Sequence, residues 1–269
     1  MDLTAVRDRG LVLLGCGKMG SAMLRGWLAD GLPPASVWVV DPAPSDWLQG
    51  TGVHLNEGVP EAPALLLVAV KPQMMAEALP QAARLGGGGT AVLSVAAGTP
   101  IARFEEVFGD GTPVVRAMPN TPAAVGQGIT AIVANDPGQA ALDVAEALLS
   151  AVGEVVRLDD EDQIDAVTGV SGSGPAYVFH LIETLAAAGA AEGLAPDLAL
   201  QLARATVAGA GVLALEEGAD PAQLRRDVTS PNGTTQAGLE VLMDPDSGLP
   251  PLMRRTVAAA AARARELRA

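Results

Sequence analysis

Strand-length apolar runs alternate with helix-like segments through the first 160 residues. The runs occupy residues 11–14, 37–40, 65–70, 91–95, 114–116, 129–133 and 154–157. Between them, apolar residues recur at helical spacing in 21–30, 74–85, 101–107 and 140–149. Short, wholly apolar runs are typical of strands buried on both faces of a parallel sheet. The pattern predicts an α/β fold with a Rossmann-type parallel sheet, interrupted by an irregular, proline-containing segment at 118–122.

From about residue 160 the alternation stops and helices take over. Residues 177–189 and 198–215 are apolar on nearly every side, and the second segment contains Gly209 and Gly211. Such helices need burial all round, and interior glycines, which each weaken a helix by roughly 1 kcal/mol, imply a closely packed neighbour. We therefore predict that these helices interleave with a second copy of the chain. The Ala- and Arg-rich helix 251–268 is predicted to be a solvated outer element.

This change of pattern divides the 269-residue chain into two predicted domains. Residues 1–160 are predicted to form a dinucleotide-binding Rossmann domain. Residues 161–269 are predicted to form an all-α domain for substrate binding and dimerisation.

The composition of the chain argues against several classes of binding partner. The formal net charge is -14, whereas nucleic acid or an anionic membrane surface requires a basic face, so neither partner is expected. The single cysteine, Cys16, excludes an internal disulfide, and the two histidines, His54 and His180, are too few for a zinc cluster. Charged residues within the first ten positions argue against a signal peptide. We expect a metal-free cytoplasmic protein.

A glycine-rich segment follows the first predicted strand. The run at 11–14 leads into Gly15-Cys16-Gly17-Lys18-Met19-Gly20, and a helix follows. In this arrangement the first glycine makes a tight turn, the second lets the backbone approach a pyrophosphate, and the third lets the helix pack on the strand. The strand before it and the helix after it favour dinucleotide binding over a purely structural turn.

Asp41 ends the second strand, about twenty residues beyond the glycines, where an acid normally binds the ribose hydroxyls of NAD. It could also be a turn residue before Pro42. Residues 41–46 contain no Arg or Lys to meet the 2′-phosphate of NADP, which by itself favours NADH. The small residues 96–98 end another strand, at the edge along which ligands bind in open α/β sheets.

A hydroxyl-rich turn at residues 227–236 precedes a predicted helix. Pro231 and Gly233 shape a tight loop, while Ser230, Thr234 and Thr235 supply hydroxyls at positions suited to capping. A helix start offers free N–H groups and the positive end of a dipole, which together suit a carboxylate or phosphate. Alone, this turn could be a simple helix cap. Beside a dinucleotide-binding domain, it is the predicted substrate site.

Several motifs, taken in order, resemble those of pyrroline-5-carboxylate reductases. Besides the N-terminal glycines they are Val70-Lys71-Pro72, Met118-Pro119-Asn120, Gly172-Ser173-Gly174-Pro175-Ala176-Tyr177 and Thr229-Ser230-Pro231-Asn232-Gly233-Thr234-Thr235. The resemblance covers essentially the whole chain and is most specific over residues 221–242. It implies reduction of 1-pyrroline-5-carboxylate to L-proline by NADPH or NADH, the last step of proline biosynthesis. It also implies a homodimer through the C-terminal helices, with a ring of dimers as a further assembly.

The resemblance implies roles for individual residues. Gly15, Gly17, Lys18, Met19 and Gly20 would hold the cofactor pyrophosphate, Asn56 would reach the adenosine ribose, and Ala69, Val70, Lys71, Val95 and Ala97 would line the cofactor. Ser230, Gly233, Thr234 and Thr235 would bind the substrate, with Glu161 close to it. Two departures matter: Asp227 stands where an amide can touch the cofactor, and Met243 stands where a polar residue is usual.

The expected chemistry needs little activation. A protonated cyclic imine is already an electrophile, so the site contributes mainly positioning and charge complementarity. Thr235 is the predicted catalytic residue, because its hydroxyl would hydrogen-bond the ring nitrogen.

Three other functions are compatible with parts of this pattern. A hydroxyacid dehydrogenase of related architecture would need a lysine on the first helix of the second domain, and residues 171–201 contain none. A serine hydrolase is disfavoured because Ser171 and Ser173 lack a strand-elbow pattern. A non-catalytic dinucleotide-binding protein remains the alternative from a different class, and it predicts cofactor binding without turnover.

Overall fold

The computed structural model describes residues 3–216, 218 and 220–268. The chain packs into two compact units, residues 1–172 with 260–269, and residues 173–259. We call them the sheet unit and the helical unit. These units are defined by how the chain packs. The predicted boundary at residue 160 instead separates dinucleotide binding from substrate binding and dimerisation, and it stays a prediction.

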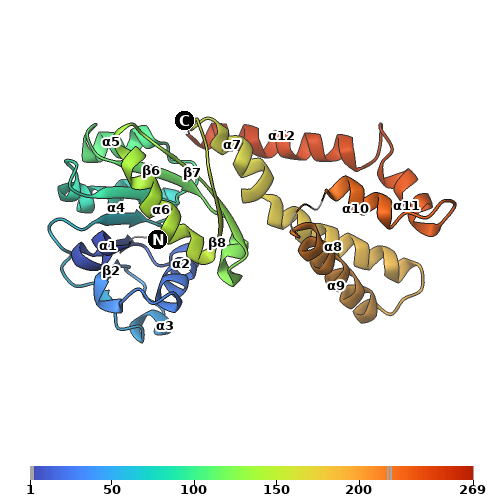
Figure 1. The fold of residues 1–269 in the computed structure, drawn as a ribbon, viewed down its shortest axis with the longest axis horizontal. Helices are drawn as coiled ribbons and strands as arrows, with labels where there is room; N and C mark the ends of the chain where they lie inside the picture. Colours follow the sequence, from blue (N-terminus) through green and yellow to red (C-terminus); the bar gives the residue numbers. More distant parts are fainter. Residues whose placement is uncertain (1–2, 217, 219, 269) are drawn as a thin grey trace. The chain divides into compact units, whose positions relative to one another are not determined.

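The sheet unit is built on a sheet with the strand order β3-β2-β1-β4-β5-β6-β7-β8 (Figure 1). Its described strands are β1 (Leu11–Leu14), β2 (Val37–Val40), β3 (His54–Leu55), β4 (Leu65–Val68), β5 (Ala91–Ser94), β6 (Val114–Met118), β7 (Gly128–Ala134) and β8 (Gly153–Arg157). Neighbouring strands in this described part pair in parallel, except for β6 with β7. The Rossmann-type sheet is confirmed, with one antiparallel pair in addition.

The strands at the centre of the sheet end at the same level. Leu14 of β1 pairs with Val40 of β2 and with Val68 of β4. Every residue of β1 and β4 is buried, as expected for wholly apolar strands covered on both faces. Because parallel strands that end together send their loops to one edge, the segments after β1, β2 and β4 meet there.

Helices cover both faces of this sheet (Figure 1). They are α1 (Thr4–Arg9), α2 (Lys18–Ala29), α3 (Asp46–Gln49), α4 (Met75–Ala82), α5 (Ile101–Phe108), α6 (Leu142–Leu149) and α7 (Gln163–Val167). Met23 and Trp27 of α2 share one apolar core with Leu148 of α6. Leu79 of α4 and Phe104 of α5 belong to a second core. The sheet unit is therefore a three-layer structure with a core on each side.

The segment predicted to be irregular is partly regular. Met118 closes β6, and residues 121–125 form a 3-10 helix with proline in its first turn. Proline lacks only an N–H group that the start of a helix does not use, so Pro122 begins this turn without disrupting it. The prediction of irregular structure over 118–122 is therefore wrong for residues 118, 121 and 122.

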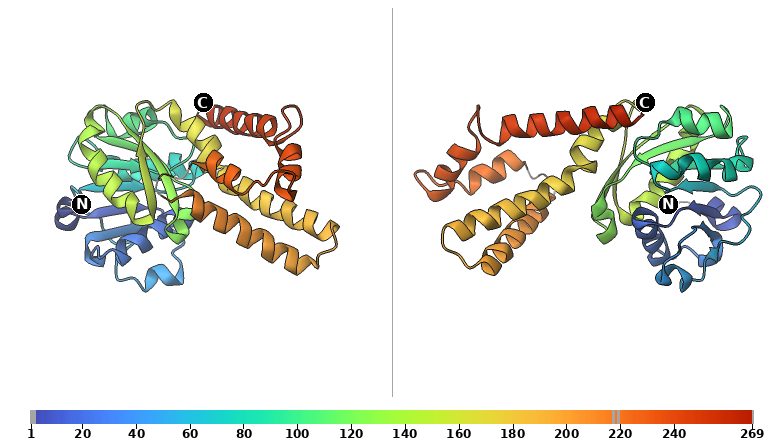
Figure 2. Two further views of the ribbon diagram at one scale, coloured as in Figure 1. Left: turned by 45° about the vertical axis from the view of Figure 1, so that its right-hand side comes forward. Right: turned by 180° about the vertical axis from the view of Figure 1, so that it is seen from behind.

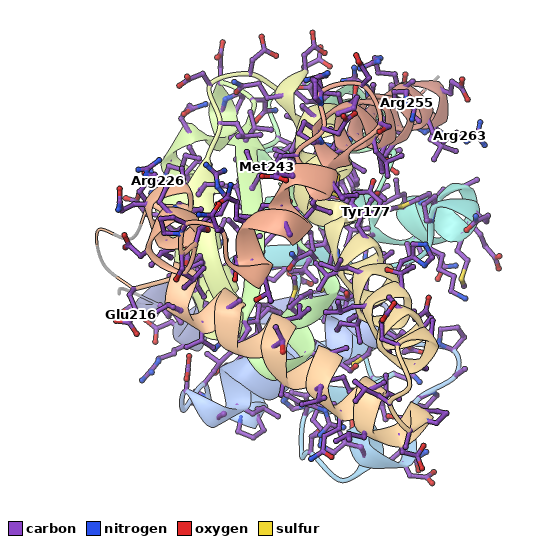
Figure 3. All side chains as sticks on the ribbon, turned by 90° about the vertical axis from the view of Figure 1, so that its right-hand side faces the viewer. Tyr177, Glu216, Arg226, Met243, Arg255 and Arg263 are labelled. Atoms are coloured by element: carbon purple, nitrogen blue, oxygen red, sulfur yellow. The ribbon has the colours of Figure 1, made fainter. Side chains whose placement is uncertain are left out.

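The helical unit exposes most of its apolar side chains. Its described helices are α8 (Gly174–Ala191), α9 (Pro196–Ala214), α10 (Pro221–Asp227), α11 (Thr234–Leu242) and most of α12 (Leu249–Arg268). Helices α8 and α9 lie side by side (Figure 2). Of the apolar residues described in this unit, only Ala186, Ala199 and Ala203 are buried. Figure 3 looks onto the unit with its side chains drawn.

Glycines in these helices show where a neighbour is present. A Cβ at Gly189 would lie 3.5 Å from the Cβ of Ala199, an ordinary contact distance, so α9 is the neighbour of α8 at this glycine. In contrast, a Cβ at Gly209 or Gly211 would meet nothing within 4 Å in the described chain. The described part of the chain therefore does not supply the neighbour that the sequence predicts for these two glycines.

Helix α12 corrects one prediction. Its last part belongs to the sheet unit, where Ala261 and Ala264 are buried. Gly98 also packs against it, because a Cβ on Gly98 would lie 3.2 Å from the carbonyl oxygen of Leu267. The expected solvated outer helix is thus wrong for its carboxyl-terminal end, where small alanines allow close packing. None of the helices in the described ranges is long and apolar enough to span a bilayer.

Candidate functional site

The glycine-rich loop between β1 and α2 has the geometry of a phosphate-binding turn. Gly15 adopts φ +86°, and a Cβ there would lie 2.9 Å from Val70 Cγ1. A Cβ on Gly20 would lie 2.5 Å from the carbonyl oxygen of Gly15, so the first turn of α2 packs directly on the loop. A Cβ on Gly17 would meet nothing within 4 Å, which leaves space beside the start of α2. This space and the free N–H groups of α2 fit a pyrophosphate.

Asp41 holds this loop to the end of β2. Its Oδ2 accepts a hydrogen bond from the Cys16 N–H at 2.6 Å, and its Oδ1 accepts one from the Ala43 N–H at 2.8 Å. Asn56, at φ +53°, exchanges two hydrogen bonds with the backbone of Asp41, at 2.9 and 2.8 Å. The structure therefore brings Asp41 and Asn56 together. Asp41 thus holds the turn before Pro42, which is the alternative interpretation of this residue. Its carboxylate also keeps lone pairs that could accept a hydrogen bond from a ribose hydroxyl.

A cleft of about 200 Å³ lies at this edge of the sheet. It is lined by Leu14, Val40, Pro42, Asn56, Val70, Met74, Glu77, Ala78 and Gln81. Its walls are mostly apolar, as a purine ring requires, and its one charged lining residue is Glu77. This cleft fits the adenosine half of a dinucleotide.

The next two strands along the sheet lead to the other predicted cofactor residues. Ala69 donates its N–H to the Leu14 carbonyl at 2.8 Å, and Val95 donates its N–H to the Val68 carbonyl at 3.1 Å. Val70 and Val95 are half-buried, whereas Lys71 and Ala97 are exposed. These residues lie along the edge that also carries Gly15 and Asp41. The described residues contain no cluster of three or more potential metal ligands.

The Cys16 side chain lies inside this loop. Burial and the nearby charge of Asp41 raise the pKa of its thiol to about 11. The thiol is therefore protonated near neutral pH and is not a nucleophile there.

Glu161 occupies a structural position in the sheet unit. Its Oε1 accepts a hydrogen bond from the Ile101 N–H at 2.9 Å, at the start of α5. The same oxygen lies 2.6 Å from Nη1 of Arg116, which is buried. This carboxylate therefore caps α5 and balances a buried guanidinium. Its predicted position near the substrate stays a prediction.

The predicted substrate residues belong to the helical unit. The turn closes with a hydrogen bond from the Gly233 N–H to the Ser230 carbonyl at 3.0 Å, and Asn232 adopts φ +58°. Helix α11 begins at Thr234, and Gly233 supplies no side-chain cap. The hydroxyls of Ser230, Thr234 and Thr235 have no hydrogen-bond partner within the described chain. The turn therefore offers N–H groups and free hydroxyls to a ligand.

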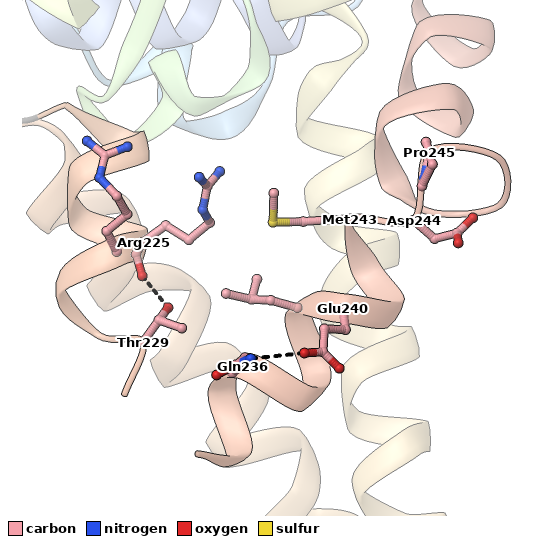
Figure 4. Close-up of a pocket in the computed structure, with 9 residues that line it drawn as sticks. Arg225, Thr229, Gln236, Glu240, Met243, Asp244 and Pro245 are labelled. Atoms are coloured by element: carbon pink, nitrogen blue, oxygen red, sulfur yellow. Dashed lines mark hydrogen bonds between the residues drawn. The ribbon is translucent and has the colours of Figure 1, made fainter. Parts of the chain in front are cut away.

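A wide cleft of about 620 Å³ lies between α10 and α11, beside this turn (Figure 4). It is lined by Arg225, Arg226, Thr229, Gln236, Leu239, Glu240, Met243, Asp244 and Pro245. On one wall, Thr229 donates its hydroxyl to the Arg225 carbonyl at 2.6 Å, and on the other the Gln236 amide donates to Glu240 at 3.0 Å (Figure 4). Met243, the residue that departs from the family pattern, lines this cleft rather than the turn. Asp227 accepts a hydrogen bond from Gln223 at 2.6 Å.

Comparison with known proteins identifies the family. A family model for pyrroline-5-carboxylate reductase dimerisation matches residues 161–267, and one described as NADP oxidoreductase, coenzyme F420-dependent, matches residues 11–98. A pyrroline-5-carboxylate reductase of Pseudomonas aeruginosa is 39% identical over 264 residues, which are 96% of each chain. That of Pisum sativum is 36% identical over 96% of this chain and 95% of its own. The chain belongs to the pyrroline-5-carboxylate reductase family.

Solved structures of other pyrroline-5-carboxylate reductases share the fold. That from Coxiella burnetii superposes with a TM-score of 0.89 at 32% identity, covering 96% of this chain and 98% of its own. A Plasmodium falciparum pyrroline carboxylate reductase with NADP bound superposes with a TM-score of 0.82 at 24% identity, covering 98% and 99%. At 24% identity, this second likeness is evidence for a shared fold only. The reductase described here thus has the predicted fold class, a Rossmann-type sheet followed by a helical region that matches the family's dimerisation model, and it is a homo-oligomer.

The sequence alone does not reveal two features of this reductase. One is the hydrogen bond between Asp41 and the Cys16 N–H, because no local pattern links residues that are so far apart in the chain. The other is the buried Arg116 beside Glu161. An arginine inside an otherwise apolar strand is a signal for a buried ion pair, although the sequence does not identify its partner.

Proposed function

We propose that this chain reduces 1-pyrroline-5-carboxylate to L-proline with NADPH or NADH, the last step of proline biosynthesis. The observation that carries the proposal is similarity to pyrroline-5-carboxylate reductases along 96% of the chain. The glycine-rich edge of the sheet unit supports it independently, because it combines a pyrophosphate turn with an adenosine-sized cleft.

The proposed substrate site is the turn at the start of α11. Backbone N–H groups of this helix start, with the hydroxyls of Ser230 and Thr234, would hold the substrate carboxylate. Thr235 would hydrogen-bond the ring nitrogen and so orient the C5 atom. When bound, the nicotinamide would supply the hydride, and a protonated imine would need no further activation to accept it. Positioning and charge complementarity are therefore the main contributions of this chain.

The proposed cofactor residues are those at the edge of the sheet. The loop glycines with Lys18 and Met19 would hold the pyrophosphate, and Asp41 with Asn56 would face the adenosine ribose. Ala69, Val70, Lys71, Val95 and Ala97 would line the remainder of the cofactor.

We further propose a preference for NADH over NADPH. The Asp41 carboxylate is held at the end of β2 by two backbone N–H groups, and Glu77 lines the same cleft. No Lys or Arg lines this cleft among the described residues. A 2′-phosphate placed here would meet negative charge without a cationic partner, whereas a ribose hydroxyl would find an acceptor.

The proposed assembly is a dimer through the C-terminal helices, with a ring of dimers as a higher state. The exposed apolar side chains of α8 and α9 support this interface, because a unit whose described apolar residues include only three buried alanines cannot close its own core. We also propose that the protein works in the cytoplasm.

A single assay tests the function. Purified protein is mixed with 1-pyrroline-5-carboxylate and either NADH or NADPH, and the nicotinamide absorbance is followed while proline is measured. We expect loss of absorbance with one proline formed per cofactor oxidised, faster with NADH. Cofactor binding without proline formation would instead support a dinucleotide-binding protein. Equal or faster turnover with NADPH would contradict the cofactor preference alone.

A further inference from the structure

The loop after β5 packs against the end of helix α12. We call residues 95–100 the cofactor loop, because it contains Val95 and Ala97, and the inference therefore rests on the proposed function. Gly98, at φ +75°, lies so close to α12 that a Cβ would be 3.2 Å from the Leu267 carbonyl oxygen and 3.4 Å from its Cβ. The position of α12 therefore limits where the cofactor loop can lie.

Arg268 fixes this end of α12 to α7, the neighbouring helix in Figure 1. Its Nη2 lies 2.8 Å from Oδ2 of Asp165, and its Nη1 donates a hydrogen bond to Oδ1 of Asp162 at 3.1 Å. Asp165 is only 2% exposed, and its Oδ2 has no aligned hydrogen-bond donor among the described residues. Arg268 is thus the positive charge that balances a buried carboxylate.

The other end of the cofactor loop is fixed by the same segment of the chain. Glu161 accepts a hydrogen bond from the Ile101 N–H, directly after the loop, and pairs with the buried Arg116. Residues 161–165 therefore contact the start of α5 through Glu161 and the end of α12 through Asp165. The cofactor loop lies between these two attachments.

We propose that Arg268 is a positioning residue for the nicotinamide cofactor. Its ion pair with Asp165 fixes the end of α12, and Leu267 on that end packs against Gly98 of the cofactor loop. Without the guanidinium, the buried charge of Asp165 is unpaired, so the end of α12 and the loop against it lose their defined position. Hydride transfer depends on exact placement of the donor, so a small shift of this loop is sufficient to weaken cofactor use.

The test compares three variants of the full-length protein. Arg268→Ala should raise KM for NADH, and Kd measured by NADH fluorescence, by about tenfold, because removing one partner of a buried ion pair disrupts its surroundings. KM for the imino acid should change less than about twofold, because its proposed site lies in the helical unit. Arg268→Lys should restore most of the affinity. Arg263→Ala is the matched control, because Arg263 is 66% exposed on the same helix (Figure 3).

A double-mutant cycle tests the route through Asp165. Asp165→Asn should also raise KM for NADH, and the double variant should be no worse than the poorer single variant. The proposal is overturned if Arg268→Ala lowers Tm while leaving the Kd of NADH unchanged, or if it raises only KM for the imino acid. It is equally overturned if the two substitutions are additive. Should the wild-type protein bind NADH without reducing the imino acid, the proposed function fails, and the Kd series still decides the role of Arg268.

Discussion

The two units of this chain differ in how they bury apolar surface. In the sheet unit, large side chains such as Leu67, Leu93 and Phe104 are 0% exposed, and the core closes within one chain. In the helical unit, Phe179 on α8 and Val212 on α9 are 59% and 65% exposed. The sheet unit closes its own core, whereas we propose that the helical unit is one half of a core that a second copy completes. Cofactor binding and assembly are therefore expected to respond to different substitutions.

The largest effect should come from charging the exposed face of α8. Phe179→Glu would place a carboxylate where we propose that a second copy packs, and it should dissociate the oligomer and lower turnover by more than about 100-fold. Light scattering reports the molar mass and the absorbance assay reports the rate. Val125→Glu is the matched control, because Val125 is 75% exposed in the sheet unit. An oligomer that survives Phe179→Glu unchanged would remove this face from the interface.

The second effect separates chemistry from cofactor binding. Thr235→Ala removes the hydroxyl proposed for the ring nitrogen and should lower kcat by about 100-fold, as loss of one well-placed donor does in other enzymes. The Kd of NADH should stay unchanged, because the cofactor edge lies in the other unit. Thr256→Ala, which removes a hydroxyl bonded within α12, is the control. Wild-type turnover in Thr235→Ala would refute the proposed role.

The third effect is confined to the sheet unit. Asp41→Ser removes the carboxylate at the end of β2 and should shift the ratio of kcat/KM values toward NADPH by about tenfold. The molar mass of the oligomer should not change. Asp46→Ser serves as the control, because it removes a nearby carboxylate at the start of α3 but leaves Asp41 in place. An unchanged ratio would show that Asp41 supports the glycine loop without selecting the cofactor.

The smallest effect concerns the buried thiol. In the unfolded chain the Cys16 thiol ionises near its ordinary pKa of 9.0, whereas in the folded protein its pKa is about 11. The protonated form is therefore favoured by folding, and its contribution to stability is present below pH 9.0 and lost as pH rises toward 11. The free energy of unfolding, measured in urea at several pH values, should fall more steeply over this range than in Cys16→Ser. Equal slopes would mean that the loop is open to solvent.

The local pattern of apolar and polar residues predicts most strands and helices, but it does not predict the contacts between them. Residues 11–14 and 37–40 form strands with the predicted ends, because wholly apolar runs before glycine or Asp41 leave little choice. The two-residue strand β3 was missed, because so short a segment has no periodicity. Helix α12 was assigned to the outside, because its many alanines do not distinguish a solvated helix from one packed closely on a neighbour.

The sequence predicts those parts of the candidate site that lie within short motifs. The glycine-rich loop and Asn56 were located by motif and resemblance, and they do lie together at one edge of the sheet. The attachment of Glu161 to Ile101 and Arg116 joins segments distant in the chain, and only the folded structure reveals it. The roles of Ser230, Gly233, Thr234 and Thr235 stay predictions that the variants above test.

The return of helix α12 to the sheet unit has a consequence for biosynthesis. A ribosome makes residues 260–268 after the entire helical unit, yet these residues pack against Gly98 and Asp165, which precede that unit in the chain. A nascent polypeptide can thus form its strands early, but this face of the Rossmann layer is completed only when translation has passed residue 268. We therefore expect the loop that contains Gly98 to acquire its final packing only after residues 260–268 have left the ribosome.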